Sequence, residues 1–77
     1  MSDDPVILDA TGLRCPLPVL RARKAIRAMA AGATLEVLAT DPAAPADFEA
    51  FCRETGHALL GIDRSEDGCR IRIAKKA

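Results

Sequence analysis

The chain has 77 residues, of which eleven are basic and eleven acidic, so its formal net charge is +0. This length limits the protein to one domain over residues 1–77 with a modest core. The balanced charge provides no overall field for nucleic acid or a membrane surface, and Phe48 and Phe51 are the only aromatic residues, too few for a base-stacking surface. We therefore expect a single-domain monomer that makes no direct contact with nucleic acid or membrane.

The amino terminus and the cysteines indicate the compartment. The first five residues, M-S-D-D-P, are acidic and lack the basic and apolar regions of a targeting segment, and no apolar run approaches membrane-spanning length. The three cysteines form no C-x-x-C pair, which suits free thiols in a reducing compartment. One histidine, His57, is too few for a zinc site. We expect a cytoplasmic protein with neither a metal nor an organic cofactor.

The first half of the chain predicts a strand, a helix and a second strand. Val6 to Asp9 is short and β-branched, which favours a strand. From Pro16 to about Ala31 apolar residues recur at helical spacing, and Gly32 is placed as the stop of that helix. Thr34 to Thr40 alternates as a second strand, parallel to the first because a helix intervenes. The predicted core face of the helix carries Val19, Ala22, Ala25, Ile26 and Met29.

The second half predicts a helix and a hairpin. Asp41-Pro42 favours a turn, and a helix follows from about Pro45 to Thr55, with Phe48, Phe51 and Cys52 on one face and Gly56 beyond its end. The runs 57–64 and 69–75 flank S-E-D-G, a hairpin signal. The order β-α-β-α-β-β predicts an α/β (α+β) fold, a two-layer sandwich with two helices on one face of a four-stranded mixed sheet.

The segment G-L-R-C-P-L-P places a cysteine and two prolines where the first helix begins. A residue before proline is pushed out of the helical region, so Cys15 suits the N-cap and Pro16 the first helical position. Pro18 falls third, where no ladder hydrogen bond is lost. The helix end and Arg14 should favour the thiolate of Cys15 moderately, because two of the first three backbone donors are prolines.

Cys15 therefore has two interpretations, a substitute helix cap or a reactive thiol. Serine, threonine or aspartate caps a helix better, and an exposed free thiol is a liability unless it is used. Cys52 and Cys69 fall in phase with apolar residues and are predicted to be small core residues. One exposed nucleophilic thiol, without a neighbouring thiol to resolve it, is therefore expected.

The motif D-x-x-G-L-R-C-P-x-P resembles that of the TusA/SirA-like sulfur-carrier family, and the likeness extends over essentially the whole chain. It includes Arg23-Lys24, the G-x-T-L segment from Gly32 to Leu35, Asp41-Pro42 and Phe51-Cys52. The motif residues here are Asp9, Gly12, Leu13, Arg14, Cys15, Pro16 and Pro18.

The resemblance implies the same β-α-β-α-β-β sandwich and a sulfurtransferase-type role as a protein co-substrate. Cys15 would accept sulfane sulfur as a persulfide from a cysteine desulfurase or a rhodanese-like donor and pass it to an acceptor protein. The best-known branch leads to thiolation of a tRNA wobble uridine; others serve sulfur oxidation, thiosulfate use or molybdenum-cofactor synthesis. Leu17 stands where the tRNA branch tends to have glutamate, which weakens assignment to that branch.

Other residues are candidates for supporting or docking roles. Asp9 could orient Arg14 or tie the turn through backbone hydrogen bonds, Asp41 is a turn residue open to partner contact, and His57 marks a helix end. Helical rotation of about 100° per residue groups a second set on the outer side of the first helix. This set forms either a docking surface or a solvated basic face, and it consists of Leu17, Leu20, Arg23, Lys24 and Arg27.

Two rival functions remain open at this point. The same fold could serve as a regulatory or protein-interaction module without sulfur chemistry. A thiol-disulfide redox protein is disfavoured because no second cysteine lies near Cys15 in the sequence.

Overall fold

The structure, a computed structural model, describes residues 4–77. The first three residues belong to the acidic amino terminus from which no targeting segment is expected, and they lie outside the described part. In chain order the elements are β1 (Val6–Ala10), α1 (Leu17–Arg27), β2 (Thr34–Ala39), α2 (Ala44–Thr55), β3 (Ala58–Ser65) and β4 (Gly68–Ala74). The predicted β-α-β-α-β-β order is confirmed.

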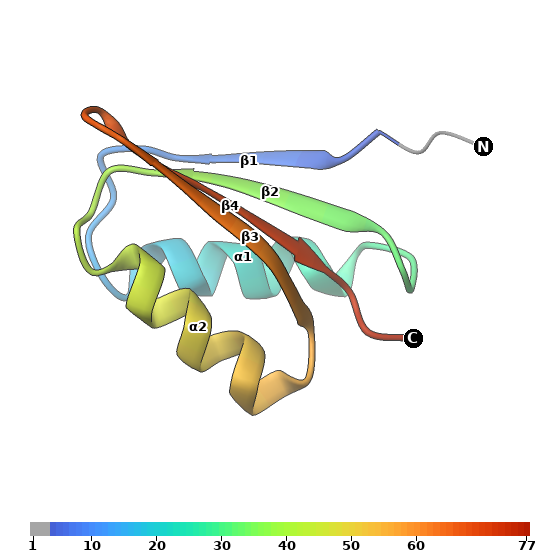
Figure 1. Ribbon diagram of the computed structural model, residues 1–77. Helices are drawn as coiled ribbons and strands as arrows, with labels where there is room; N and C mark the ends of the chain where they lie inside the picture. The colour runs from blue at the N-terminus through green and yellow to red at the C-terminus, as the bar shows by residue number, and fades with distance from the viewer. Residues whose placement is uncertain (1–3) are drawn as a thin grey trace.

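The four strands form one mixed sheet in the order β1-β2-β4-β3 (Figure 1). β1 and β2 are parallel, as predicted, with Val6 opposite Leu35 and Ala10 opposite Ala39. β4 is antiparallel to both β2 and β3, and β3 has a bulge between Leu59 and Gly61. The two parallel strands are joined through α1, so their carboxyl ends lie side by side at one edge of the sheet.

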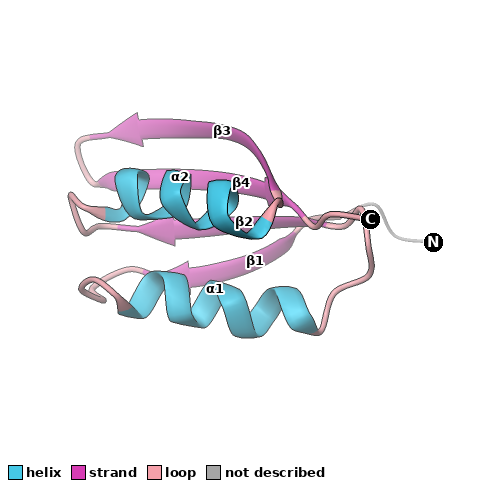
Figure 2. Ribbon diagram, turned by 90° about the horizontal axis from the view of Figure 1, so that it is seen from below, coloured by secondary structure: helices cyan, strands magenta, loops and turns pink. Residues whose placement is uncertain are grey.

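Both helices lie against the same face of the sheet, α1 under β1 and β2 and α2 under β3 and β4 (Figure 2). The core lies between the helices and this face of the sheet. The strands contribute to it because every second side chain along a strand faces the helices. Leu35 and Val37 of β2, Ile71 and Ile73 of β4 and Phe48 of α2 are fully buried there. The predicted two-layer sandwich is confirmed.

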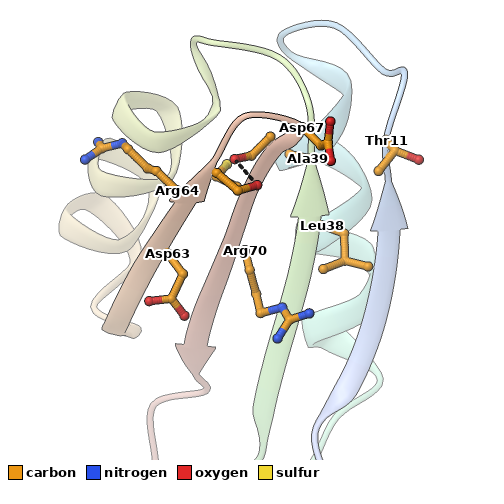
Figure 3. Close-up of a pocket in the computed structure, with 10 residues that line it drawn as sticks. Thr11, Leu38, Ala39, Asp63, Arg64, Asp67 and Arg70 are labelled. Carbon is orange, nitrogen blue, oxygen red and sulfur yellow. Dashed lines mark hydrogen bonds between the residues drawn. The ribbon is translucent and has the colours of Figure 1, made fainter.

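The opposite face of the sheet has no helix and carries charged pairs. Arg70 Nε lies 3.4 Å from Glu36 Oε1, and Arg72 lies 3.6 Å from Asp63 through one terminal guanidinium nitrogen and Oδ2. A hollow of about 300 Å³ opens at the hairpin end of this sheet, and Figure 3 shows Leu38, Asp63 and Arg70 projecting there. This face also carries apolar side chains, because Ile7, opposite Glu36, is exposed.

The first helix is shorter than the sequence predicts. It begins at Leu17 and ends at Arg27, and the Ala28 and Met29 amides then donate to Ala25 and Ile26, which are three residues back. These tighter bonds close the helix early by satisfying carbonyls that lack an ordinary partner. Gly32 (φ +84°) is therefore not the helix stop, and its amide donates to Lys75 in the turn before β2.

The second helix matches its prediction closely. It begins one residue before Pro45 and ends at Thr55, where Gly56 (φ +86°) takes the left-handed conformation that glycine allows. His57 follows directly, its Nδ1 accepts the Lys76 amide, and its ring centroid lies 5.8 Å from that of Phe51. Across residues 4–77 no helix has the length and apolar character needed to cross a membrane.

Candidate functional site

The loops that follow β1 and β2 meet because these strands are parallel neighbours. The Gly12 amide donates to Thr40 Oγ1 at 2.9 Å, and the Cys15 amide donates to Asp41 Oδ2 at 2.5 Å. Both bonds join residues more than 25 positions apart in sequence. The backbone of the Cys15 loop is thus fixed by the loop that precedes α2.

Asp9 ties the start of its own loop. Its Oδ1 accepts the Thr11 amide at 3.0 Å and the Thr11 hydroxyl at 2.6 Å. These hydrogen bonds favour the charged carboxylate, so the pKa of Asp9 lies below its ordinary value. Of the two roles considered for Asp9, the structure shows the turn role, and Gly12 (φ +79°) completes that turn.

Cys15 is not the N-cap of α1, contrary to the prediction. Pro16 (φ −98°, ψ 15°) occupies that position, and the helix starts at Leu17 with Pro18 second. The Leu17 amide donates to the Arg14 carbonyl at 2.8 Å, which closes a turn ahead of the helix and carries Cys15 outside it. The Cys15–Pro16 peptide bond in this turn is cis. Pro18 is buried, so it also packs against the core.

Asp41 joins the starts of the two helices. Its Oδ1 accepts the Ala43 amide and its carbonyl accepts the Ala44 amide, both at 3.0 Å, while Oδ2 holds Cys15. The two backbone hydrogen bonds, from Ala43 and then Cys15, together with the charge of Arg14, keep the pKa of Asp41 below its ordinary value. Sequence reasoning placed Asp41 in a turn; its link to the Cys15 backbone was missed.

The thiol of Cys15 is exposed at one end of a groove between α1 and α2 of about 190 Å³. A hydrogen bond to the Asp47 carboxylate, partial loss of hydration and the negative charges of Asp47 and Asp41 all raise the pKa of the Cys15 thiol. The predicted stabilisation of the thiolate is therefore wrong. The side chains that line the groove are Cys15, Pro16, Val19, Arg23, Asp47, Ala50, Phe51 and Glu54.

Asp47 is the site residue that sequence reasoning missed. It lies in the first turn of α2, and its amide donates to the Ala43 carbonyl at 3.0 Å. The available signal was an acidic residue near the start of the second helix, because that helix begins at the same sheet edge as the Cys15 loop. Its pairing with Cys15 depends on how the helices are placed, which periodicity does not give.

The candidate docking residues lie along α1 and differ in what they contact. Leu17 and Leu20 are 45% and 50% exposed, large values for leucine, and Lys24 and Arg27 are exposed beside them. Arg23 has a partner within the chain, because its guanidinium carbon lies 5.2 Å from the centroid of the Phe51 ring. Arg23 therefore lines the groove that also contains Cys15.

The other two cysteines are less accessible than Cys15. Cys52 is buried and Cys69 half-buried against the core, and burial raises the pKa of both thiols. All three cysteines are free. Among residues 4–77, no three side chains of His, Cys, Asp or Glu are grouped so that they could hold a metal ion.

The fold and the site define a small two-layer domain with one exposed free thiol beside the starts of its two helices. Comparison with known proteins identifies the family. The family model described as "Sulfurtransferase TusA" matches residues 6–75, so the chain belongs to the TusA family of sulfur carriers.

Relatives agree with this assignment, and a solved structure shows the same fold. The chain is 48% identical over 76 residues to a protein named "Sulfur carrier protein TusA" from Allochromatium vinosum, covering 99% of this chain and 97% of that protein. A protein of the same name from Pseudomonas entomophila is 47% identical over 91% of this chain and 88% of its own length. The crystal structure of a SirA-like protein from Desulfitobacterium hafniense has the same fold, with a TM-score of 0.80 at 24% identity over 94% of this chain and 99% of the other.

Proposed function

We propose that the chain carries one sulfane sulfur atom as a persulfide on Cys15, in the cytoplasm, between a donor protein and an acceptor protein. The observation that carries this proposal is the contrast among the thiols, because Cys15 is exposed while Cys52 is buried and Cys69 half-buried. Membership of a sulfur-carrier family supports the same role. A carrier needs one accessible sulfur atom and no neighbouring thiol to release the cargo as sulfide.

Each transfer exchanges one sulfur–sulfur bond for another. The Cys15 thiolate attacks the terminal sulfur of a persulfide on the donor, a new bond forms to Cys15, and the bond to the donor cysteine breaks. The electron pair of the broken bond leaves with the donor sulfur, which takes up the proton that the Cys15 thiol gave up. Delivery repeats these steps with the acceptor thiol as the nucleophile, and no external oxidant or reductant is consumed.

The donor in this proposal is a cysteine desulfurase or a rhodanese-like protein, and the acceptor begins a route to tRNA thiolation, sulfur oxidation, thiosulfate use or molybdenum-cofactor synthesis. The docking surface of the proposal combines exposed leucines for affinity with basic residues for orientation. Asp41 adjoins this surface through the Cys15 loop. The proposed docking residues are Leu17, Leu20, Arg23, Lys24, Arg27 and Asp41.

Intact mass spectrometry tests the carrier proposal. The protein is incubated with a cysteine desulfurase and free cysteine, and a mass gain of one sulfur atom is expected. The gain is expected to disappear in Cys15→Ser and to persist in Cys52→Ala. If neither a desulfurase nor a rhodanese with thiosulfate produces an adduct, the chain is an interaction module and the proposal is wrong.

A charge-reversal pair tests the docking surface. Arg27→Glu is expected to slow sulfur transfer from the protein donor several-fold. It places a negative charge at a position where, in this proposal, a positive side chain orients the partner. Arg21→Glu is the matched control, because Arg21 is exposed on the same helix outside the proposed surface. Equal transfer rates for the two variants would show that these basic residues form only a solvated helix face.

A further inference from the structure

The groove between α1 and α2 places a carboxylate beside the reactive thiol. Cys15 enters the groove from the loop before α1, and Asp47 from the first turn of α2. Both side chains line this groove, and hydrogen bonding of the thiol to the Asp47 carboxylate is the largest of the causes that raise the pKa of Cys15. The backbone of Cys15 is fixed separately by Asp41, so removing the Asp47 charge leaves the loop tied in place.

The other charges around the thiol do not cancel that of Asp47. Asp41 faces Cys15 from the loop before α2 and adds to the negative field. The charge of Arg14 acts on the Asp41 carboxylate, and the guanidinium of Arg23 lies over the Phe51 ring. Glu54 lines the groove as a further carboxylate. The free carrier therefore surrounds its thiol mostly with negative charge.

We propose that Asp47 is a positioning residue that holds Cys15 as a hydrogen-bonded thiol in the free carrier and opposes its conversion to the reactive anion. This inference rests on the proposed function, because it gives a reason for an exposed sulfur atom to stay unreactive between partners. A thiol reacts with alkylating agents, disulfides and persulfides through its thiolate. A carboxylate hydrogen-bonded to the thiol and repelling the thiolate reduces the fraction of that form.

The restraint favours transfer from a docked donor over reaction with small molecules. A partner that brings a cation to Asp47 offsets the negative charge and frees the thiolate while the two sulfur atoms are in contact. A small oxidant or electrophile in solution brings no such cation and meets the protonated thiol. Selectivity then comes from docking, which agrees with a thiol that the fold presents without activating.

The test measures alkylation of Cys15 by iodoacetamide across a pH series, in the complete unloaded protein. Iodoacetamide is uncharged, so its rate reports the thiolate fraction without an electrostatic attraction of its own. Asp47→Asn removes the charge and keeps a side chain that hydrogen-bonds. We expect this variant to react several-fold faster near neutral pH, with its pH profile moved to lower pH. Mass spectrometry of the Cys15 peptide separates this reaction from any at Cys52 or Cys69.

Two further variants and the high-pH limit separate charge from structure. Glu54→Gln removes a carboxylate from the same groove and is expected to leave the profile unchanged, while Asp47→Glu restores the charge and should restore slow alkylation. At high pH, where the thiolate dominates, wild type and Asp47→Asn should react at the same rate, because access is unchanged. A profile that does not move in Asp47→Asn, or a rate difference that persists undiminished at high pH, overturns the proposal.

The experiment needs no sulfur donor, so its outcome is independent of whether the chain carries sulfur. A shifted alkylation profile with no sulfur loading would reject the carrier function and keep the restraint on the thiol. Sulfur loading on Cys15 together with an unshifted alkylation profile would support the carrier function and reject the role proposed for Asp47. The circular dichroism melt of each variant confirms that the rates belong to folded protein.

Discussion

Gly68, the first residue of β4, allows the hairpin to pack closely against the end of β2. Its φ of +144° lies in the region that side chains rarely adopt, and an added Cβ would overlap the main-chain carbonyl oxygen of Ala39. The same Cβ would lie 3.2 Å from the Cα of Thr40. These neighbours are backbone atoms at the end of β2 and directly after it, so no side-chain rotation relieves the contact. Gly68→Ala must therefore move the hairpin or the end of β2.

The cost of Gly68→Ala has two parts. A side chain held in a disfavoured backbone region costs about 1–3 kcal/mol, and a forced shift in a packed region costs about 1–3 kcal/mol more. The expected loss of about 2–6 kcal/mol is large beside the roughly 4–12 kcal/mol that stabilises a chain of this length. Gly32→Ala is the matched control, because Gly32 also has a positive φ but has open space around it. Only the backbone cost applies there, about 1–2 kcal/mol.

Urea unfolding of the two variants checks this reasoning. The midpoint of Gly68→Ala is expected to fall clearly below that of Gly32→Ala, with similar slopes, because a change of midpoint at constant slope is a change of stability. Equal losses in the two variants would show that the contact between the hairpin and β2 is not tight, and would refute the reasoning.

The remaining predictions concern the core and pH. Phe48→Ala, at a fully buried ring set edge-on to Phe51, is expected to lose about 3–5 kcal/mol, measured by thermal unfolding; a loss under about 1 kcal/mol would contradict its place in the core. Partial burial and the charges of Lys76 and Lys75 lower the pKa of His57, and its Nδ1 accepts a hydrogen bond that protonation removes. The unfolded state therefore binds this proton more readily, and stability should fall as pH drops below about 6.5. NMR titration of the single histidine and urea unfolding from pH 7.5 to 5 check this; a midpoint above the ordinary histidine value would contradict it.

The fold was predictable from local patterns because this chain uses them consistently. The alternation at Leu35 and Val37 predicts a strand, and Gly56 predicts the end of a helix. Tertiary packing agrees with both. The end of α1 was the main error. Helical spacing continues to Met29, and Gly32 has the character of a stop, but the chain tightens into bonds between residues three apart directly after Arg27. Periodicity reports which residues face the core, and it does not report where the hydrogen-bond pattern changes.

The candidate site was predictable only in part, because its contacts join distant segments. The exposed cysteine and its prolines form a local motif, so Cys15 could be singled out from the sequence. Asp41 meets the Cys15 backbone across 26 positions, and Asp47 approaches the thiol from another helix. The sequence predicted moderate stabilisation of the thiolate because that reasoning considered only the helix that follows Cys15 and the neighbouring Arg14. The carboxylates that reverse this effect belong to the loop before α2 and to α2 itself.

These contacts give the two prolines a different meaning from the one the motif suggests. The helix begins one residue past the prediction, with Pro16 as its N-cap, and the turn closed by Leu17 leaves Cys15 outside the helix. The Cys15 amide then donates to Asp41, and the Asp47 carboxylate raises the pKa of the Cys15 thiol. Because neither contact favours the thiolate, the role proposed for Asp47 requires that the docked partner bring the reactivity. The ratio of the transfer rate from a protein donor to the alkylation rate should therefore fall in Asp47→Asn, since that variant reacts faster with small molecules and gains nothing in docking.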